Sequence, residues 1–330
     1  MRHEPEPEAG LNAPISTRTA HSAQRRAQVR RRRAAAVAAL TAVLMLVVLA
    51  VSSGGGGAPA PRKAADSGSG SKPGAPGRAK RAPGGAPATR AGGPETAGGS
   101  LLARENAAID RLLVRQPFIV SGGTEKREIA LTFDDGPGPY TPMLLGQLQR
   151  LHLPATFFEI GFMIHYFHQS LSRELKMDTV IGDHTETHPM MAELSPSAQD
   201  NQIVVQTQQL ARYRAPFPRL YRPPYGSFDK ATFSVLRGLN MLMVLWTVDT
   251  EDYTKPGVPA IVHNALAGAR PGAIILLHDA GGIRTETTAA LPLIVRALRA
   301  RHYKLVTVPR LILDDPPRQA QALPTHLVNG

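Results

Sequence analysis

The sequence contains no cysteine among its 330 residues. Disulfide frameworks, thiolate metal sites and a cysteine nucleophile are therefore excluded. Any metal ion must be bound through nitrogen and oxygen atoms, from histidine and carboxylate side chains. The sequence also lacks the glycine-rich pattern of a dinucleotide-binding turn, which argues against an open doubly wound nucleotide-binding sheet.

Negative charge is scarce, since 26 Asp and Glu face 38 Lys and Arg, for a net charge of +12. Most of the excess lies at the N-terminus. Residues 1–33 carry eight basic and three acidic side chains, and residues 53–100 carry seven and two. Residues 101–330 carry 23 and 21, a net charge of only +2. A nucleic-acid-binding module needs its positive charge on the folded surface, so we expect no nucleic-acid partner.

Between these two basic regions, residues 34–52 contain no charged side chain. At about 1.5 Å per residue, a helix of this length can cross a hydrocarbon core of about 30 Å. Four arginines at 30–33 precede it, so the positive-inside rule predicts a single-pass membrane anchor with a cytoplasmic tail at 1–33. The rest of the chain would then be extracytoplasmic at the cell membrane. A cleaved signal peptide and a secreted protein are the alternative.

Residues 53–100 are dominated by Gly, Pro and Ala. Such a composition cannot bury enough apolar surface to offset chain entropy, and it predicts a disordered linker. We expect residues 101–314 to form the folded domain. Residues 315–330 have two consecutive prolines and little apolar periodicity, which predicts a flexible C-terminal tail. None of these patterns determines an oligomeric state.

The predicted domain alternates short apolar runs with amphipathic stretches, the pattern of an α/β fold. Continuous apolar runs such as AIILL are typical of parallel strands buried on both faces. About seven such strands with helices between them favour a (β/α) barrel. Strands are predicted at 128–135, 155–161, 179–183, 220–223, 241–249, 273–279 and 304–308. Helices are predicted at 142–151, 164–176, 196–213, 230–239, 258–267 and 286–301.

Titratable or polar residues follow five of these strands. Because a parallel α/β fold places its site at the carboxyl ends of the strands, we expect these residues to gather at one rim. They are Asp134 and Asp135, His184 and His188, Arg222 and Tyr225, Asp249 and Asp252, and His278 and Asp279.

The sequence HTETHP at 184–189 places His184 and His188 four residues apart, so that on a helical turn one metal ion can bridge both imidazoles. Pro189 disfavours a helical conformation at His188, and Thr185 replaces the glutamate of a zinc-protease helix, so a protease is not favoured. A third ligand must come from elsewhere. A carboxylate suits a hydrolytic site that keeps an open position for water.

Asp134 and Asp135 offer two carboxylates at the end of one predicted strand. Consecutive strand residues point in opposite directions unless the chain turns, and the Gly-Pro-Gly sequence at 136–138 turns it sharply. One aspartate can therefore bind the ion while the other faces its water.

Five motifs together resemble those of the polysaccharide deacetylases, the NodB-homology carbohydrate esterases. The resemblance covers about residues 128–310 and implies a distorted, incomplete (β/α) barrel and an extracellular polysaccharide substrate. In chain order the motifs are TFDDGP at 132–137, HTETHP at 184–189, RPPYG at 222–226, VDTEDY at 248–253 and LLHD at 276–279.

The resemblance implies roles for the catalytic residues. Asp134 would be the catalytic base, and Arg222 would orient it and pair with its charge. His278 would be the general acid, with its proton affinity tuned by Asp252. The implied ligands of a divalent metal are Asp135, His184 and His188. Zinc is the ion we expect, with cobalt, nickel or manganese as alternatives.

The resemblance also implies which residues contact the substrate. The backbone N–H of Tyr225 would bind the oxyanion, Leu276 would line the pocket for the acetyl methyl group, and Pro223 would lie beside them. Tyr253 provides an aromatic wall where many relatives have tryptophan. Asp183 stands before His184 where asparagine is common, which adds a carboxylate beside the metal site.

The sequence therefore predicts a metal-dependent enzyme that removes acetyl groups from N-acetylglucosamine-type units of a cell-envelope polysaccharide. Peptidoglycan is the first candidate for this substrate. An O-acetyl esterase acting on xylan-type chains and a chitooligosaccharide deacetylase are alternatives. A catalytically silent, wall-anchored glycan-binding protein is the alternative of another class. Such a protein would be expected to lack a metal ligand or the base, and this chain retains them all.

Overall fold

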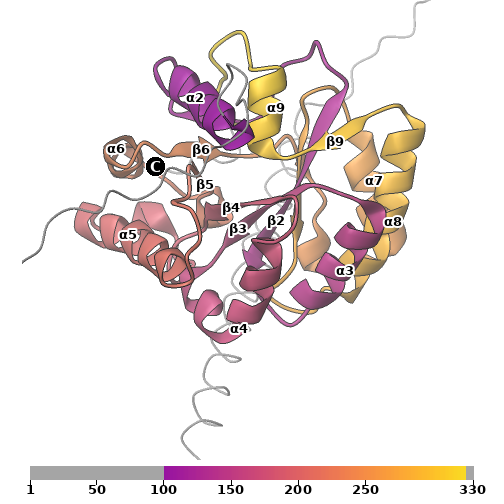
Figure 1. The fold of residues 1–330 in the computed structure, drawn as a ribbon, viewed down its shortest axis with the longest axis horizontal. Helices are drawn as coiled ribbons and strands as arrows, with labels where there is room; N and C mark the ends of the chain where they lie inside the picture. Colours follow the sequence, from indigo (N-terminus) through magenta and orange to yellow (C-terminus); the bar gives the residue numbers. More distant parts are fainter. Residues whose placement is uncertain (1–99, 325–330) are drawn as a thin grey trace, which may run out of the picture. The chain divides into compact units, whose positions relative to one another are not determined.

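The computed structural model describes residues 100–324 (Figure 1). The predicted tail at 1–33, the predicted anchor at 34–52 and all but the last residue of the predicted linker lie outside this range. Among the described helices, none has the length and apolar character that crossing a membrane requires.

One parallel sheet forms the centre of the described domain (Figure 1). Its strands run in the order β1, β6, β5, β4, β3, β2, β8, β7, and β9 also pairs with β2. The path begins at β1 and ends at β7, so the curled sheet is an incomplete barrel, as expected from the sequence. The strands are β1 (Phe118–Ile119), β2 (Glu128–Gly136), β3 (Ala155–Glu159), β4 (Thr179–Asp183), β5 (Leu220–Tyr221), β6 (Leu242–Val244), β7 (Val248–Asp249), β8 (Ile274–His278) and β9 (Lys304–Val306).

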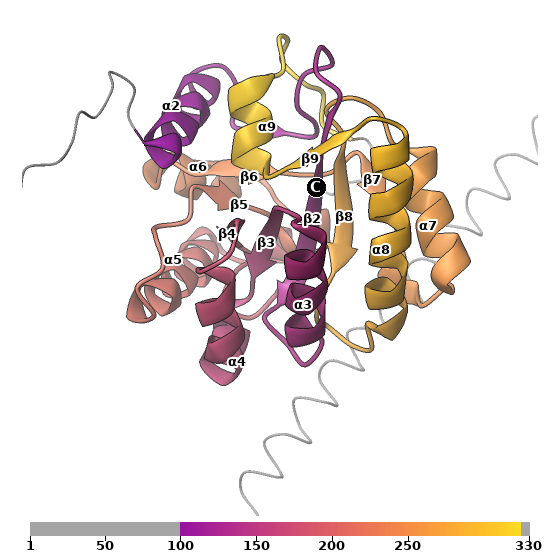
Figure 2. The same ribbon diagram turned by 45° about the vertical axis from the view of Figure 1, so that its right-hand side comes forward.

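Helices flank the sheet, and Figure 2 shows α3, α4, α5, α7 and α8 around its outer side. The six predicted helices all form, with ends within three residues of the prediction. Two further helices, α2 and α9, were not predicted, and they pack together (Figures 1 and 2). The helices are α2 (Leu101–Leu113), α3 (Thr141–Leu151), α4 (Gly161–Glu174), α5 (Pro196–Arg212), α6 (Lys230–Gly238), α7 (Val258–Ala267), α8 (Thr285–Ala300) and α9 (Val308–Asp314).

The prediction of one strand over 241–249 was wrong, because the chain changes partners within it. β6 pairs with β5 and β1, whereas β7 pairs with β8. Between them Leu245 donates to Ile119 O at 2.8 Å and Thr247 donates to Ile274 O at 3.0 Å. The residues between β6 and β7 thus carry the chain from one end of the strand order to the other. Together with β1, which is too short to show an alternating pattern, it raises the strand count of the described domain to nine.

The first part of the predicted C-terminal tail lies against the domain. Asp315 is buried, and its Oδ2 accepts hydrogen bonds from the backbone N–H groups of Glu125 and Lys126 at 2.7 and 2.8 Å. The side chain of Gln321 accepts from Val120 N at 2.7 Å and donates to Ser121 O at 3.0 Å. These contacts hold the region around residues 315–321 beside β1.

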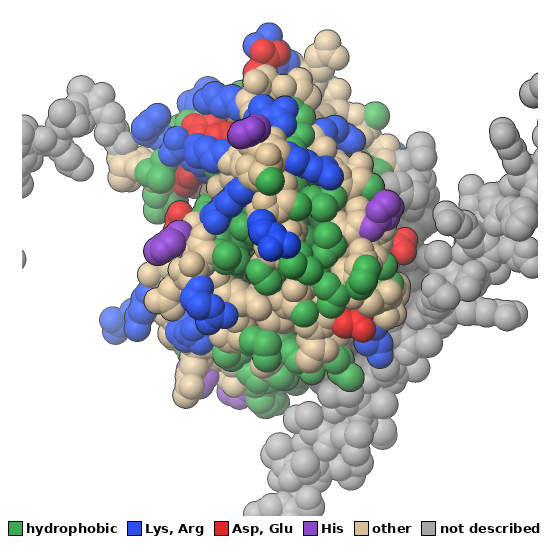
Figure 3. Space-filling model, turned by 90° about the vertical axis from the view of Figure 1, so that its right-hand side faces the viewer, with side chains coloured by type: hydrophobic (Ala, Val, Ile, Leu, Met, Phe, Trp, Pro, Cys, Tyr) green, Lys and Arg blue, Asp and Glu red, His purple; other side chains and the backbone are tan. Residues whose placement is uncertain are grey.

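The hydrophobic core lies between the sheet and the outer helices, and every residue of β2 is buried. Leu291 of α8 is fully buried in this core, whereas Leu293, two residues further on, is 38% exposed. Figure 3 shows the side that carries α3, α7 and α8, where apolar side chains mix with Lys and Arg.

Leu291 and Leu293 provide a matched test of how α8 packs on the core. Leu291→Ala should lower the free energy of unfolding by about 2–5 kcal/mol, because it removes a fully buried side chain and leaves a cavity. Leu293→Ala on the same helix should change it by only about 0.5 kcal/mol. Urea unfolding of the two purified variants measures the difference, and equal midpoints would contradict the placement of α8.

Candidate metal and acid–base site

The candidate site lies at the carboxyl ends of neighbouring strands. β2 lies between β3 and β8, and Asp134 is the register partner of both Phe158 and His278. His184 follows β4, and Arg222 follows β5. Parallel pairing thus gathers residues that are up to 144 positions apart, from 134 to 278, at one edge of the sheet.

A β-bulge explains how two consecutive aspartates serve one site. Across β3, Asp134 pairs with Phe158 and Gly136 pairs with Glu159, so Asp135 is an extra residue in β2. Its backbone has φ of 75°, the left-handed conformation that a bulge can impose. The turn at 136–138 was expected to reorient the side chains, but the change of direction occurs within the strand, at Asp135.

Three potential metal ligands converge. Oδ1 of Asp135 lies 3.0 Å from Nε2 of His188 and 3.6 Å from Nε2 of His184. One ligand atom from each residue lies within 4.8 Å of the other two. Burial acts to raise the pKa of Asp135, but the charge of His188 and hydrogen bonds from both imidazoles hold it well below its usual range.

The two histidines meet in a loop and not on the helical turn that their four-residue spacing suggests, in agreement with the effect expected of Pro189. Thr185 and His188 both have left-handed backbones, with φ of 70° and 61°. Oδ1 of Asp183 accepts from Thr185 N at 2.7 Å, and Oγ1 of Thr185 accepts from His188 N at 3.0 Å. Nδ1 of His184 lies 2.7 Å from Arg222 O. A proton on Nδ1 leaves Nε2 of His184 as the metal-facing acceptor.

Asp183 is the carboxylate that the sequence analysis noted before His184. It is fully buried, and burial raises its pKa well above the usual value despite the bond from Thr185. Its side chain shapes the loop through that bond. It is not one of the three clustered ligands.

Arg222 pairs with Asp134 inside the protein. Its Nη1 donates to Asp134 Oδ1 at 2.8 Å, and the guanidinium lies 4.1 Å from the centre of the Phe158 ring. Burial lowers the pKa of Arg222, while Asp134 opposes this effect. Further hydrogen bonds hold its orientation. They go to Thr132 Oγ1 at 2.7 Å, Val244 O at 3.0 Å and Leu245 O at 3.1 Å.

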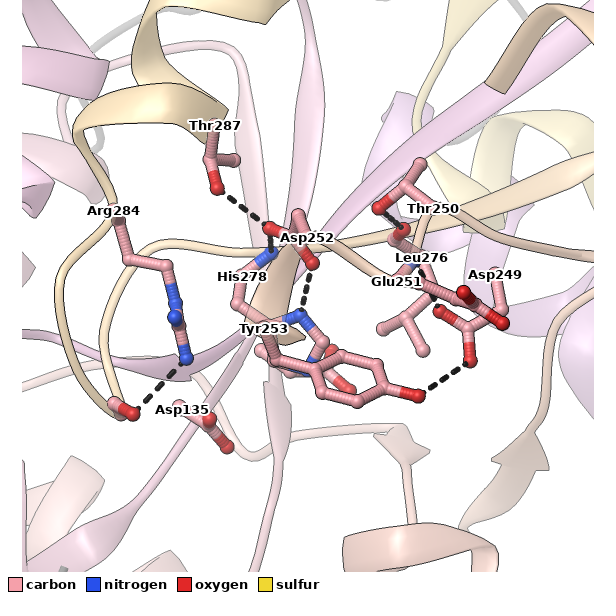
Figure 4. A network of polar contacts seen from close by, with 12 residues as sticks. Asp135, Asp249, Thr250, Glu251, Asp252, Tyr253, Leu276, His278, Arg284 and Thr287 are labelled. Carbon is pink, nitrogen blue, oxygen red and sulfur yellow. Dashed lines mark hydrogen bonds and ion pairs between the residues drawn. The ribbon is translucent and has the colours of Figure 1, made fainter. Parts of the chain in front are cut away.

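His278 pairs with Asp252 on the other side of the site (Figure 4). Nδ1 of His278 lies 2.7 Å from Asp252 Oδ1, and the His278 N–H donates to Oδ2 at 2.9 Å. Thr287 also donates to Asp252 Oδ2, at 2.7 Å. Burial lowers the pKa of His278, but the charge and hydrogen bond of Asp252 outweigh it and raise the pKa to about 9.

Arg284 is a site residue that the sequence analysis missed. It is only 3% exposed, and it interacts electrostatically with Asp252 and His278 (Figure 4). Its charge acts to lower the pKa of His278, against the effect of Asp252. The sequence did offer one signal for a role at the site, because Arg284 is a basic residue that follows the LLHD motif closely.

Two predicted strand-end carboxylates point elsewhere. The Asp279 side chain accepts a hydrogen bond from Thr141 at the start of α3, and burial is the main cause that raises its pKa to about 7. Asp249 Oδ1 accepts from Glu251 N at 2.8 Å, and its Oδ2 accepts from the Tyr253 hydroxyl at 3.4 Å. Asp249 therefore supports the loop that carries Asp252 and Tyr253.

Two of the predicted substrate-contacting residues are aromatic and lie against histidines of the site. The Tyr225 ring lies 4.5 Å from that of His188, and Tyr253 lies 5.3 Å from His278. Tyr225 has φ of 57°, in the short helix Pro224–Gly226 that Pro223 precedes. Leu276 is buried on β8, two residues before His278.

The family model described as polysaccharide deacetylase matches residues 121–244. A peptidoglycan-N-acetylglucosamine deacetylase of Bacillus cereus is 37% identical over 187 residues, covering 56% of this chain and 87% of that one. A chitooligosaccharide deacetylase of Bradyrhizobium is 33% identical, covering 60% and 95%. A solved structure of a peptidoglycan N-acetylglucosamine deacetylase in complex with 4-naphthalen-1-yl-N-oxidanyl-benzamide matches with a TM-score of 0.58 and 32% identity, covering 61% and 95%.

These relatives match over most of their own length, and the range of the family model contains Asp134, Asp135, His184, His188 and Arg222. The five motifs and the incomplete parallel barrel lead to the same assignment. The chain belongs to the polysaccharide deacetylase family of carbohydrate esterases, as the sequence predicted.

Proposed function

We propose that this protein is a metal-dependent hydrolase that removes acetyl groups from N-acetylglucosamine-type units of peptidoglycan. The observation that carries the proposal is the pairing of two groups in opposite charge environments beside one ligand cluster. Asp134 lies against a buried arginine, and His278 lies against a buried aspartate. Groups with such different environments are suited to act as base and acid in one reaction.

The cluster of Asp135, His184 and His188 would hold the metal. One carboxylate and two imidazoles are typical ligands of hydrolytic zinc sites, and the bond from His184 Nδ1 to Arg222 O is the usual support of a ligating histidine. A divalent cation in this site supplies Lewis-acid chemistry, which makes water more acidic and polarises a carbonyl. Zinc suits these ligands best, with cobalt, nickel or manganese as alternatives.

Asp134 would accept the proton of the attacking water. Its Oδ1 is held by Arg222, while its Oδ2 lies 3.8 Å from His184 Nε2, on the side of the ligand cluster. The buried guanidinium stays protonated and fixes the carboxylate in place. Proton removal in step with attack forms the new carbon–oxygen bond.

His278 would give its proton to the leaving nitrogen as the carbon–nitrogen bond breaks. An amine is a poor leaving group until it is protonated, so amide hydrolysis needs a separate acid. Asp252 binds Nδ1 and thereby directs Nε2 toward the site. The backbone N–H of Tyr225 would stabilise the oxyanion, and Leu276 with Pro223 would enclose the acetyl group. Tyr253 would form one wall for the sugar.

The substrate class follows from the relatives and from the chain's organisation. The curated Bacillus cereus relative is named for peptidoglycan N-acetylglucosamine. An anchor at 34–52 and a linker at 53–100 would place the domain within reach of the envelope. The Bradyrhizobium relative favours a chitooligosaccharide as the second candidate. A catalytically silent glycan-binding protein fits less well, because the base, the acid and all three ligands are present and converge.

Acetate release tests the function directly. The protein should release acetate from intact peptidoglycan and from N-acetylglucosamine oligomers, because a proton donor for the amine is built into the site. Quantification of acetate with O-acetylated xylan as the parallel substrate distinguishes the amide from the ester reaction. Activity confined to the ester would sink the N-deacetylase assignment.

Two substitutions separate metal binding from proton transfer. His188→Ala should lower zinc occupancy by about 10-fold or more, because it removes one ligand. Asp134→Asn should retain zinc but lower kcat by about 10²-fold or more, because it removes the base. Elemental analysis after dialysis and acetate assays measure both. Full zinc occupancy in His188→Ala would refute the ligand set.

The pH dependence of kcat/KM tests the acid. His278 must be protonated to act, so activity should fall as the pH rises through about 9. Asp252→Asn removes the carboxylate that raises this pKa, and the alkaline limb should move to lower pH. A pH profile from 6 to about 10 checks the shift. An unchanged or upward-shifted limb would show that another group is the acid.

A further inference from the structure

A short loop connects the end of β8 to the start of α8, and Arg284 holds its shape. Nη1 of Arg284 donates to Ile283 O at 3.1 Å, and Nη2 donates to Gly281 O at 3.0 Å. Arg284 is buried, since the residue exposes only 3% of its surface. Both terminal nitrogens thus bind the loop's own carbonyl oxygens.

The same loop packs tightly against the candidate site. Gly281 and Gly282 have φ of 70° and 138°, conformations that favour glycine. A Cβ atom on Gly281 would lie 2.1 Å from Oδ2 of Asp135, so only glycine fits there. On the other side, a Cβ on Gly138 would lie 2.4 Å from the Cβ of Ala280. The loop backbone therefore forms one side of the site and has little room to move.

Ile283 is the exception to this burial. It is 56% exposed, although its own carbonyl is bound by the buried Arg284. A single exposed apolar residue is ordinary on a protein surface. Here, however, the side chain stands on a fixed backbone two residues from the glycine that contacts Asp135. An apolar group that is already fixed in place loses little conformational entropy when a ligand covers it.

We propose that Ile283 is a specificity-determining residue that contacts the apolar C–H face of a hexose ring in the substrate, and that Arg284 is the positioning residue that presents it. The inference rests on the proposed function and extends it to a contact beyond the reacting acetamido group. Besides its charge effect on His278, the arginine acts on the loop, because its two terminal nitrogens bind the carbonyl oxygens of Gly281 and Ile283.

Four variants test the inference, with acetate release from an N-acetylglucosamine tetramer as the assay. Ile283→Ser should raise KM about 3- to 10-fold, the loss expected for part of an apolar contact, and leave kcat within about twofold. Ile283→Leu should restore a KM near that of the wild type. Leu293→Ser, an exposed apolar position on α8, is the matched control and should change neither constant. Arg284→Lys keeps the charge but cannot bind both carbonyl groups, and it should raise KM like Ile283→Ser.

The double variant decides whether Arg284 acts through Ile283. If it does, Ile283→Ser combined with Arg284→Lys should raise KM no more than Ile283→Ser alone. Additive effects would refute the positioning role, and an unchanged KM in Ile283→Ser would refute the contact. Thermal unfolding of each variant identifies any loss of fold, and Ile283→Ser, a surface change, tests the contact if Arg284→Lys unfolds.

Direct binding separates this inference from the proposed function. Calorimetric titration of the tetramer into Asp134→Asn and into Asp134→Asn combined with Ile283→Ser, both of which lack the proposed base, measures the ratio of Kd values without turnover. A wild type that binds the tetramer but releases no acetate would refute the deacetylase proposal alone. Equal Kd values for the two proteins would refute the Ile283 contact alone.

Discussion

The alternation of side chains along a β-strand is the constraint on which this site depends. Two consecutive residues of a regular strand face opposite sides of the sheet, yet Asp134 and Asp135 both face the same cluster. The extra residue in β2 resolves this conflict by placing Asp135 in a left-handed backbone between two registers. One carboxylate is thereby free to join two imidazoles, while its neighbour stays in the strand and meets Arg222. Gly281 has to lack a side chain for the bulge to fit.

The site also requires that Arg222 and Asp252 stay charged although they are buried. Arg222 is fully buried, and a buried ion pair contributes little to stability because desolvation offsets the attraction. The bonds to Thr132 and to two backbone carbonyl oxygens satisfy its other donors. Asp252 is likewise buried and receives three donors, from His278 and Thr287. These networks hold the proposed base, Asp134, and the proposed acid, His278, in fixed positions, and the charge of Arg284 acts to lower the pKa of His278.

The misassignments have different causes. The apolar run at 241–249 looks like one strand, but its ends belong to different neighbours, which no local pattern reveals. Helix α2 did carry signals: Ser100 caps its N-terminus, and Ala108 and Leu112 lie four residues apart on its buried side. Asp279 stands in the fifth motif like its neighbour His278, but its side chain accepts a hydrogen bond from Thr141 at the start of α3.

The sequence by itself determined the class of fold, the helices around the sheet and the identity of the residues that gather at its edge. It did so because parallel strands read as continuous apolar runs and because their carboxyl ends share one rim. Only the tertiary structure decided how those residues face one another. The bulge at Asp135, the loop conformation of His188 and the return of Arg284 toward His278 all depend on backbone segments distant in sequence. Those segments meet only when the sheet has assembled.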